Sequence, residues 1–211
     1  MTPKKDLELY LHIPFCRQKC RYCDFLSAPL AADSSTADGY VPEAYVDALL
    51  SQIVQESQFY QERRVTTIFW GGGTPSLLRV MDMERLMDAI RAHFCVADDA
   101  EITLESNPGT LDFEKLAGYR RAGINRLSMG LQSACDKELA MLGRIHNFDT
   151  FVQNYKQARR AGFENIKDKI EAPDVYLKLK KEKLSDKLPV EELQKRLSEL
   201  QEFLKQPKCE E

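Results

Sequence analysis

The 211-residue sequence has no long apolar segment and no excess of basic residues. No run approaches the roughly 18 apolar residues of a membrane span, and the chain does not begin with the apolar stretch of a signal peptide. Lys and Arg number 30 against 33 Asp and Glu, for a net charge of -3. Such a chain is not drawn to polyanions, so we expect neither nucleic acid nor an anionic membrane as a partner. We expect a cytoplasmic protein without a transmembrane segment.

Glycine is missing from the C-terminal part, since all ten glycines lie between Gly39 and Gly162. After Ile166, 22 of 45 residues are charged, against 41 of the first 166. This shift predicts a boundary between residues 1–166 and a charged, helical extension of residues 167–211. A helix is expected to begin after Ser185 or Pro189, and it could pack on its own domain or mediate self-association. Its apolar stripe consists of Leu193, Leu197, Leu200 and Leu204.

Before this boundary, strand-like runs alternate with segments of helical periodicity. The expected strands are residues 8–14, 66–70, 101–105 and 126–132, and the expected helices are residues 42–62, 82–94, 112–122 and 148–161. Gly123 and Gly162 are predicted to end the last two helices. Four such units predict an α/β fold, a partial TIM-type (βα) barrel around a parallel sheet. A fifth strand ought to begin at residues 163–166, but Lys167-Asp168-Lys169 is not expected to form a buried strand.

Three of the six cysteines lie within eight residues, directly after the first expected strand. Disulfide frameworks are typical of smaller chains in oxidising surroundings, so reduced thiols or metal ligands are expected. A [4Fe-4S] cluster normally takes four thiolates. Cys16, Cys20 and Cys23 would therefore leave one iron open to an exogenous molecule, by the logic that separates catalytic from structural zinc sites. A zinc site completed by His12, and unligated thiols, are the alternatives.

The segment from Tyr10 to Phe25, Tyr-Leu-His-Ile-Pro-Phe-Cys-Arg-Gln-Lys-Cys-Arg-Tyr-Cys-Asp-Phe, carries a resemblance to a known family. It resembles the radical S-adenosylmethionine (SAM) superfamily and, within it, the branch of oxygen-independent coproporphyrinogen III oxidases and HemW-like haem chaperones. The resemblance covers about residues 7–166. It implies a [4Fe-4S] cluster on the three cysteines, with SAM chelating the open iron and receiving one electron to release a 5'-deoxyadenosyl radical. It leaves enzymatic turnover open.

Later motifs follow the ends of the other expected strands. The glycines between Trp70 and Ser76 let backbone groups approach a ligand closely, although a tight turn needs them too. Glu105 could bind a cation or ribose hydroxyls, or be solvated, and Arg144 could grip a carboxylate or be a surface charge. Because parallel strands end at one rim, we expect these groups to converge with the cysteines. The resemblance implies that SAM is held by Tyr10, Gly72, Gly73, Thr74, Glu105, Gln132 and Arg144.

Two features depart from the resembled family. The oxidase branch has a further cysteine two residues after the third ligand, where this chain has Phe25, as the chaperone branch does. The family's fifth strand brings an aspartate for the cofactor ribose, and later segments bring the remaining barrel strands, a His-Asn-aromatic signature and a C-terminal domain. None of these is expected after Ile166, so residues 1–166 are expected to be a truncated radical SAM core.

These features favour a HemW-like haem chaperone, which would bind haem or a porphyrin and deliver it to a haem-receiving respiratory protein. The alternatives are an oxygen-independent coproporphyrinogen III oxidase-like enzyme, and a non-enzymatic cluster-bearing scaffold or inactive truncated product. Of the possible axial haem ligands, His12, His93 and His146 are each expected to be structural or on the surface. A barrel stopped after four strands would expose one apolar face. The leucine stripe of residues 193–204 is expected to dock there.

Overall fold

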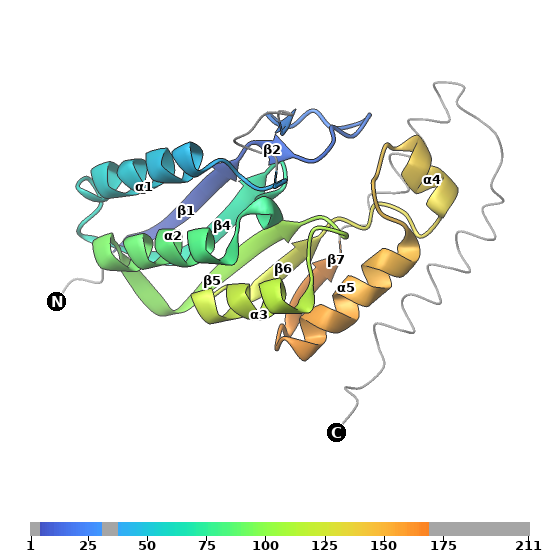
Figure 1. The fold of residues 1–211 in the computed structure, drawn as a ribbon. Helices are drawn as coiled ribbons and strands as arrows, with labels where there is room; N and C mark the ends of the chain where they lie inside the picture. The colour runs from blue at the N-terminus through green and yellow to red at the C-terminus, as the bar shows by residue number, and fades with distance from the viewer. Residues whose placement is uncertain (1–4, 31–37, 169–211) are drawn as a thin grey trace.

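The computed structural model describes residues 5–30 and 38–168 (Figure 1). The expected charged extension, apart from its first two residues, lies outside this part of the chain. The predictions of a helix after residue 185 or 189, of its docking and of self-association through it therefore stay predictions.

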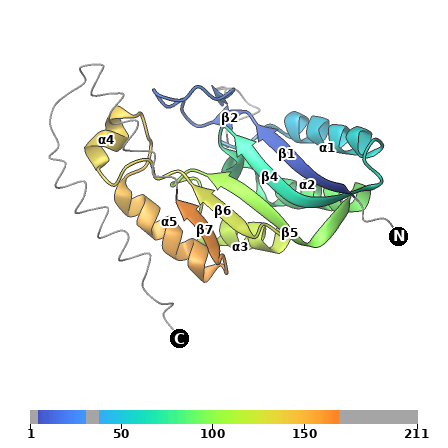
Figure 2. The same ribbon diagram turned by 180° about the vertical axis from the view of Figure 1, so that it is seen from behind.

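The described residues form a five-stranded parallel sheet with helices on one face. The strand order is β1-β4-β5-β6-β7. The strands are β1 (Lys5–Ile13), β4 (Arg63–Gly72), β5 (Cys95–Ser106), β6 (Arg126–Met129) and β7 (Asn165–Asp168). The main helices are α1 (Glu43–Ser57), α2 (Val80–His93), α3 (Phe113–Ala122) and α5 (Phe148–Arg160). Figure 1 shows the sheet from the helix side and Figure 2 from behind. This arrangement confirms the predicted partial (βα) barrel with four strand-helix units.

The hydrophobic core lies between the sheet and the helices. Successive strand residues point to opposite faces, so every second side chain of a strand meets the helical layer. Val65, Ile68 and Trp70 of β4 are fully buried, as are Leu86 and Ile90 of α2, and all five belong to one core cluster. Burying one such side chain contributes about 1.5–3 kcal/mol. The helical layer therefore fixes the position of each strand end.

The other face of the sheet is mostly polar. The strand register places Glu8, Thr67 and Glu101 side by side across β1, β4 and β5. Arg126 of β6 lies 3.2 Å from the Glu101 carboxylate on the same face. The expectation of an uncovered apolar face is therefore wrong, because side-chain alternation sends the apolar residues to the helices and leaves the polar ones in water. The stacked rings of Tyr10 and Phe69 are an apolar patch on this face, and docking of the leucine stripe of residues 193–204 stays a prediction.

A fifth strand corrects the expected end of the sheet. Residues Asn165–Asp168 form β7, which pairs in parallel with β6. Ile166 packs against the core, whereas Lys167 is exposed on the polar face. An edge strand with one solvated face needs no continuous apolar run, which is why Lys167 does not end the sheet. The strand ends at Asp168, opposite Met129, so it does carry an aspartate, and it runs two residues past the boundary expected at Ile166.

Several short elements occupy the loops at the carboxyl ends of the strands. They are β2 (Phe15–Cys16), β3 (Ala28–Pro29), the 3-10 helix η1 (Pro75–Leu77) and α4 (Asp136–Met141). The sequence did not predict them, because elements of two to six residues are too short to show a period.

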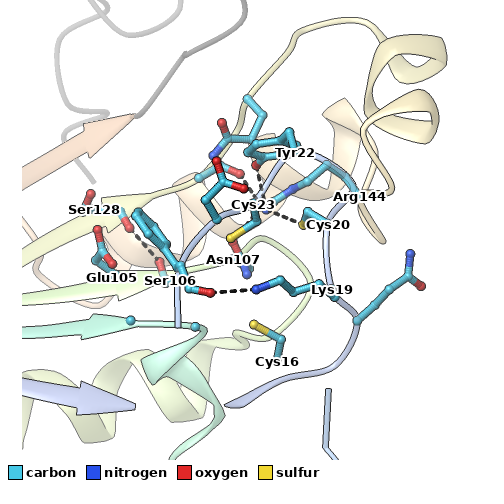
Figure 3. Close-up of a pocket in the computed structure, with 17 residues that line it drawn as sticks. Cys16, Lys19, Cys20, Tyr22, Cys23, Glu105, Ser106, Asn107, Ser128 and Arg144 are labelled. Carbon is cyan, nitrogen blue, oxygen red and sulfur yellow. Dashed lines mark hydrogen bonds between the residues drawn. The ribbon is translucent and has the colours of Figure 1, made fainter. Parts of the chain in front are cut away.

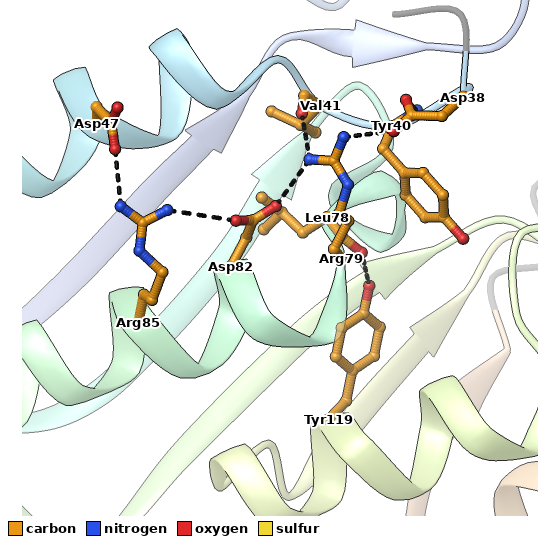
Figure 4. A network of polar contacts seen from close by, with 9 residues as sticks. All are labelled: Asp38, Tyr40, Val41, Asp47, Leu78, Arg79, Asp82, Arg85 and Tyr119. Atoms are coloured by element: carbon orange, nitrogen blue, oxygen red, sulfur yellow. Dashed lines mark hydrogen bonds and ion pairs between the residues drawn. The ribbon is translucent and has the colours of Figure 1, made fainter.

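Charged side chains fix the start of α2, directly after η1 (Figure 4). The buried Asp82 carboxylate pairs with Arg79 at 3.2 Å and with Arg85 at 3.5 Å. The Tyr119 hydroxyl of α3 donates a hydrogen bond of 2.5 Å to the carbonyl of Leu78. The segment that follows β4 and begins at Gly73 is therefore held by contacts within α2 and by α3.

Candidate functional site

The three clustered cysteines lie on one closed loop after β1 (Figure 3). Cys16 ends β2 and is buried, whereas Cys20 and Cys23 are half-buried, and all three are free thiols. The Lys19 ammonium donates to the carbonyl of Phe25 at 2.7 Å and so closes the loop on itself. The loop thus holds the thiols in place through its own backbone.

The cysteine loop is also fastened to the segment that follows α4. The amide of Arg21 donates to the carbonyl of Leu142 at 3.1 Å. The side-chain amide of Gln18 donates to the carbonyl of Gly143, also at 3.1 Å. These bonds bring the loop after β1 against the loop after β6, although more than 100 residues separate them in sequence.

A cavity of about 330 Å³ opens between these loops and the strand ends. This volume lies within the range of small-molecule sites, about 300–1,000 Å³. Among the described residues, no three His, Cys, Asp or Glu side chains converge on a single metal-ion position; the thiols instead line the shared cavity. The lining agrees with the sequence argument that these groups share one rim, and their roles as ligands stay predictions. The predicted residues in the lining are Cys16, Cys20, Cys23, Gly72, Gly73, Glu105, Gln132 and Arg144.

The glycines at the end of β4 are required by close packing against the cysteine loop. A Cβ atom on Gly73 would lie 2.6 Å from the carbonyl oxygen of Phe15 and 2.9 Å from the Cys16 sulfur. Gly72 has φ +113°, and a Cβ there would lie 2.8 Å from the His12 ring. The backbone at these two positions is therefore brought up to the first cysteine as no other residue would allow.

Asn107, which the sequence analysis did not select, connects two of the cysteines through other side chains. Its Nδ2 donates to Thr74 Oγ1 at 2.9 Å, and its Oδ1 accepts from Arg144 Nη2 at 2.6 Å. Thr74 Oγ1 in turn lies 3.5 Å from the Cys16 sulfur, and Arg144 Nη1 lies 3.5 Å from the Cys20 sulfur. Asn107 directly follows the end of β5. This position at a strand end is the sequence signal that could have identified it.

Arg144 hydrogen-bonds groups of the protein with both of its terminal nitrogens. Besides Asn107 and Cys20, Nη2 donates to the carbonyl of Gly130 at 2.7 Å and Nη1 lies 3.5 Å from the Tyr22 hydroxyl. Its Nε is buried without a hydrogen-bond partner among the described residues. Both terminal nitrogens are thus engaged with protein groups, although a guanidinium can also form a two-pronged bond to a ligand carboxylate.

Gln132 lies three residues beyond β6 and lines the cavity in an unusual backbone conformation. Its φ is +70°, the only positive φ of a non-glycine residue in the part of the chain that the structure describes. The side chain is 8% exposed, and within the same part its Oε1 has no hydrogen-bond partner. A buried acceptor without a hydrogen bond destabilises the fold, and residues with strained backbone cluster at functional sites. Both observations fit a ligand donor at this position.

Tyr10 and Thr74 are the two predicted SAM contacts that do not line the cavity: Thr74 is buried beside Cys16, whereas Tyr10 lies on the polar face of the sheet. The Tyr10 ring stacks on Phe69 at 6.1 Å and its hydroxyl lies 3.0 Å from His12 Nδ1, beside a separate cavity of about 250 Å³. Burial, with a smaller effect of the Glu105 carboxylate, raises the pKa of Tyr10. His12 Nε2 lies 2.8 Å from the Leu26 carbonyl. Both His12 nitrogens are therefore engaged, which argues against His12 as a fourth ligand of a zinc site.

Two buried basic side chains, His146 and Lys115, hydrogen-bond the loops after β6 and β4. His146 is 6% exposed, and its Nε2 donates to the carbonyl of Leu131 at 3.2 Å. Burial and the Arg144 charge lower the pKa of His146 to about 4, so the ring is neutral at pH 7. Burial also lowers the pKa of Lys115 to about 8, and its ammonium donates to the carbonyl of Ser76 at 2.6 Å. The remaining histidine, His93 of α2, is exposed.

These features define a class of protein. A family model described as the radical SAM superfamily matches residues 10–172, and the chain belongs to this superfamily. Within it, the chain is similar to proteins named heme chaperone HemW. It is 47% identical over 147 residues to that of Escherichia coli (strain K12), and 43% identical over 156 residues to that of Synechocystis. These matches cover 69% and 74% of this chain, and 37% of each relative.

A solved structure also resembles this one. The coproporphyrinogen III oxidase HemN of Escherichia coli, described as a radical SAM enzyme, matches with a TM-score of 0.69 and 31% identity. The match covers 78% of this chain and 37% of that one. The chain thus spans less than two fifths of the length of each of these proteins. Along the described residues, no helix is long and apolar enough to cross a membrane.

Proposed function

We propose that Cys16, Cys20 and Cys23 hold a [4Fe-4S] cluster with one iron open to SAM. The observation that carries this proposal is that the three free thiols line one cavity together with Gly73, where a Cβ would collide with the Cys16 sulfur. Thiolates are the usual ligands of such clusters, and the cavity leaves room for a fourth, non-protein ligand. When bound, the cluster supplies an electron for reductive cleavage of the SAM sulfonium.

The lining of the same cavity contains groups that suit SAM. Backbone amides and carbonyls at the glycine turn suit its amino acid moiety, and the free acceptor of Gln132 and the carboxylate of Glu105 suit its donor groups. Asp168, at the end of β7, stands on the strand from which the resembled family brings its ribose aspartate. Tyr10 enters the set only through the resemblance. The residues proposed to bind SAM are Tyr10, Gly72, Gly73, Thr74, Glu105, Gln132 and Arg144.

The role we propose for the bound cofactors is that of a haem chaperone, which binds haem and delivers it to a respiratory protein. Support comes from the HemW relatives and from Phe25, an exposed residue where the oxidase branch has a further cysteine. Because the chain spans 37% of the Escherichia coli relative, haem binding and delivery are proposals for this chain and need their own test.

Anaerobic reconstitution with iron and sulfide, followed by counting of both, tests the cluster. We expect about four irons and about four sulfides per chain, and loss of most of them in Cys20→Ala. Cys95→Ala is the matched control, because Cys95 is an exposed free thiol at the start of β5. About one zinc per chain without inorganic sulfide would contradict the proposal.

A coproporphyrinogen III oxidase-like enzyme is the second candidate, and the HemN structure favours it. With SAM and dithionite, formation of 5'-deoxyadenosine together with consumption of coproporphyrinogen III would support the enzyme. A haem absorption band that stays with the protein through gel filtration, without such turnover, would support the chaperone. A cluster-bearing chain that shows neither would support the non-enzymatic scaffold.

A further inference from the structure

Asn107 is the central member of a chain of hydrogen bonds that ends at two thiols. The chain runs from Cys16 through Thr74 to Asn107, and from Asn107 through Arg144 to Cys20. Its two inner bonds measure 2.9 and 2.6 Å, and the two contacts to sulfur each measure 3.5 Å. Each contact to sulfur comes from a group that can donate a hydrogen bond.

The direction of every bond in this chain follows from Arg144. A guanidinium has donors and no acceptor, so the atom of Asn107 that faces Arg144 must be the oxygen. The Asn107 amide nitrogen then faces Thr74 Oγ1, and because an amide nitrogen only donates, the hydroxyl oxygen must accept. The hydroxyl proton of Thr74 is thereby left for the Cys16 sulfur. Asn107 thus sets which way the Thr74 hydroxyl points.

Water has little room beside the Thr74 hydroxyl, which does not line the main cavity. Thr74 is 2% exposed. A small space bordered by Thr74, Asn107 and Arg144 measures about 10 Å³, which is about the volume that one water needs. The hydrogen-bond donor to the Cys16 sulfur is therefore a buried side chain positioned by Asn107, whereas Arg144, the donor to Cys20, also borders the main cavity.

We infer that Asn107 is a positioning residue that raises the reduction potential of the cluster proposed above, by keeping Thr74 and Arg144 as donors to two of its thiolate ligands. The inference rests on the proposed function. Reduction of the [4Fe-4S] cluster from the 2+ to the 1+ state adds one electron, and hydrogen bonds to the ligand sulfurs stabilise that added negative charge. Loss of a donor makes the cluster harder to reduce.

Asn107→Asp is the sharpest variant, because the side chain keeps its shape. The new carboxylate still accepts from Arg144, but it can no longer donate to Thr74. The Thr74 hydroxyl then donates to the carboxylate, and Cys16 loses its donor. In reconstituted protein without SAM, reduced with dithionite as the electron donor, we expect the midpoint potential to fall by at least about 59 mV, a tenfold shift of the one-electron equilibrium.

Thr74 variants separate the hydrogen-bond effect from that of the added charge. Thr74→Val should lower the midpoint potential by itself, and Thr74→Ser, which keeps the hydroxyl, should restore the parent value. In the Thr74→Val background, Asn107→Asp should produce a smaller shift than in the parent, since its action through Thr74 is already gone. Asp24→Asn is the control for charge, because it changes one carboxylate in the lining of the same cavity; its shift, opposite in sign, should be smaller than that of Asn107→Asp.

The outcomes distinguish the two proposals. A parent protein that binds no iron and sulfide overturns the proposed function and this inference with it. A parent and an Asn107→Asp variant with equal iron, equal sulfide and equal midpoint potentials overturn the inference alone. Equal shifts from Asn107→Asp with and without the Thr74 hydroxyl also overturn it. If Asn107→Asp fails to assemble the cluster, Thr74→Val decides, and an unchanged potential there counts against the inference.

Discussion

The loops after β1 and β4 shape the cavity through thiols and backbone, whereas the loops after β5 and β6 shape it through polar side chains. In the first half, Cys16 and Gly73 pack so closely that one added carbon would collide with a sulfur. In the second half, Asn107 and Arg144 form a hydrogen-bonded network with room beside it. Changes of size should therefore disable the first half, and changes of charge or hydrogen bonding should adjust the second in steps.

The largest effect is expected in the first half, from Gly73→Ala. Its Cβ would lie 2.6 Å from a backbone oxygen, which cannot rotate away as a side chain would. We expect the iron content after reconstitution to fall from about four to nearly zero per chain. Gly162→Ala is the control, since its φ of +89° makes it strained while nothing lies within 4 Å of the new atom.

That control should lower stability by about 1–2 kcal/mol and keep its iron. Urea denaturation and iron counting on the same samples therefore separate a damaged fold from a damaged site. A Gly73→Ala protein with as much iron and sulfide as its parent would show that the close packing of the first half is not needed for the cluster.

An intermediate effect is expected in the second half, from the pH dependence of stability at His146. Its pKa is about 4 in the folded chain against about 6.5 when unfolded. The unfolded chain therefore binds a proton first as the pH falls, so this contribution to stability is complete above about pH 6.5 and is lost between about pH 6.5 and 4. We expect His146→Gln to shrink the difference in unfolding free energy between pH 7 and pH 4.5 by about 2 kcal/mol.

His93→Gln is the matched control for that measurement. His93 is exposed in the last turn of α2, so its removal should leave the difference between the two pH values unchanged. Equal changes in the two variants would show that the neutral, buried state of His146 does not support this half of the rim.

The smallest effect, a graded one, is expected from Glu105→Gln at the end of β5. Loss of one charged hydrogen bond to SAM should weaken SAM affinity about tenfold, while iron and sulfide stay at the parent values. Glu101→Gln is the control, because it removes a carboxylate from the same face of the same strand, four residues from the cavity, where it pairs with Arg126. Equilibrium dialysis with SAM measures both, and equal affinities in the two variants would remove Glu105 from the site.

The elements that sequence predicts well are the ones with a period. The four strand-helix units, the stop at Gly123, whose φ is +105°, and the meeting of strand ends all follow from patterns of apolar and glycine residues. The cysteine triplet and the glycine turn were likewise visible, because three thiols in eight residues and three successive glycines are rare arrangements.

The remaining features depend on contacts between distant segments, which no local pattern records. Asn107 acquires its partners only when the loops after β4 and β6 fold against it, and Arg144 turns to protein acceptors for the same reason. The strand at residues 165–168 was not expected because Lys167 does not suit a buried strand. One face of this strand meets water, so Lys167 is compatible with it. Tyr10 packs against Phe69, its neighbour on the sheet, and not against the cysteine loop.

The hydrophilic side of the sheet restricts what could ever be laid over it. Carboxylates, hydroxyls and a guanidinium there keep their hydration shells, and stripping those shells is unfavourable unless an arriving surface supplies donors and acceptors of its own. The apolar face of a helix would pack poorly on this side. A hydrated surface, or one whose polar groups match those of the sheet, would suit it.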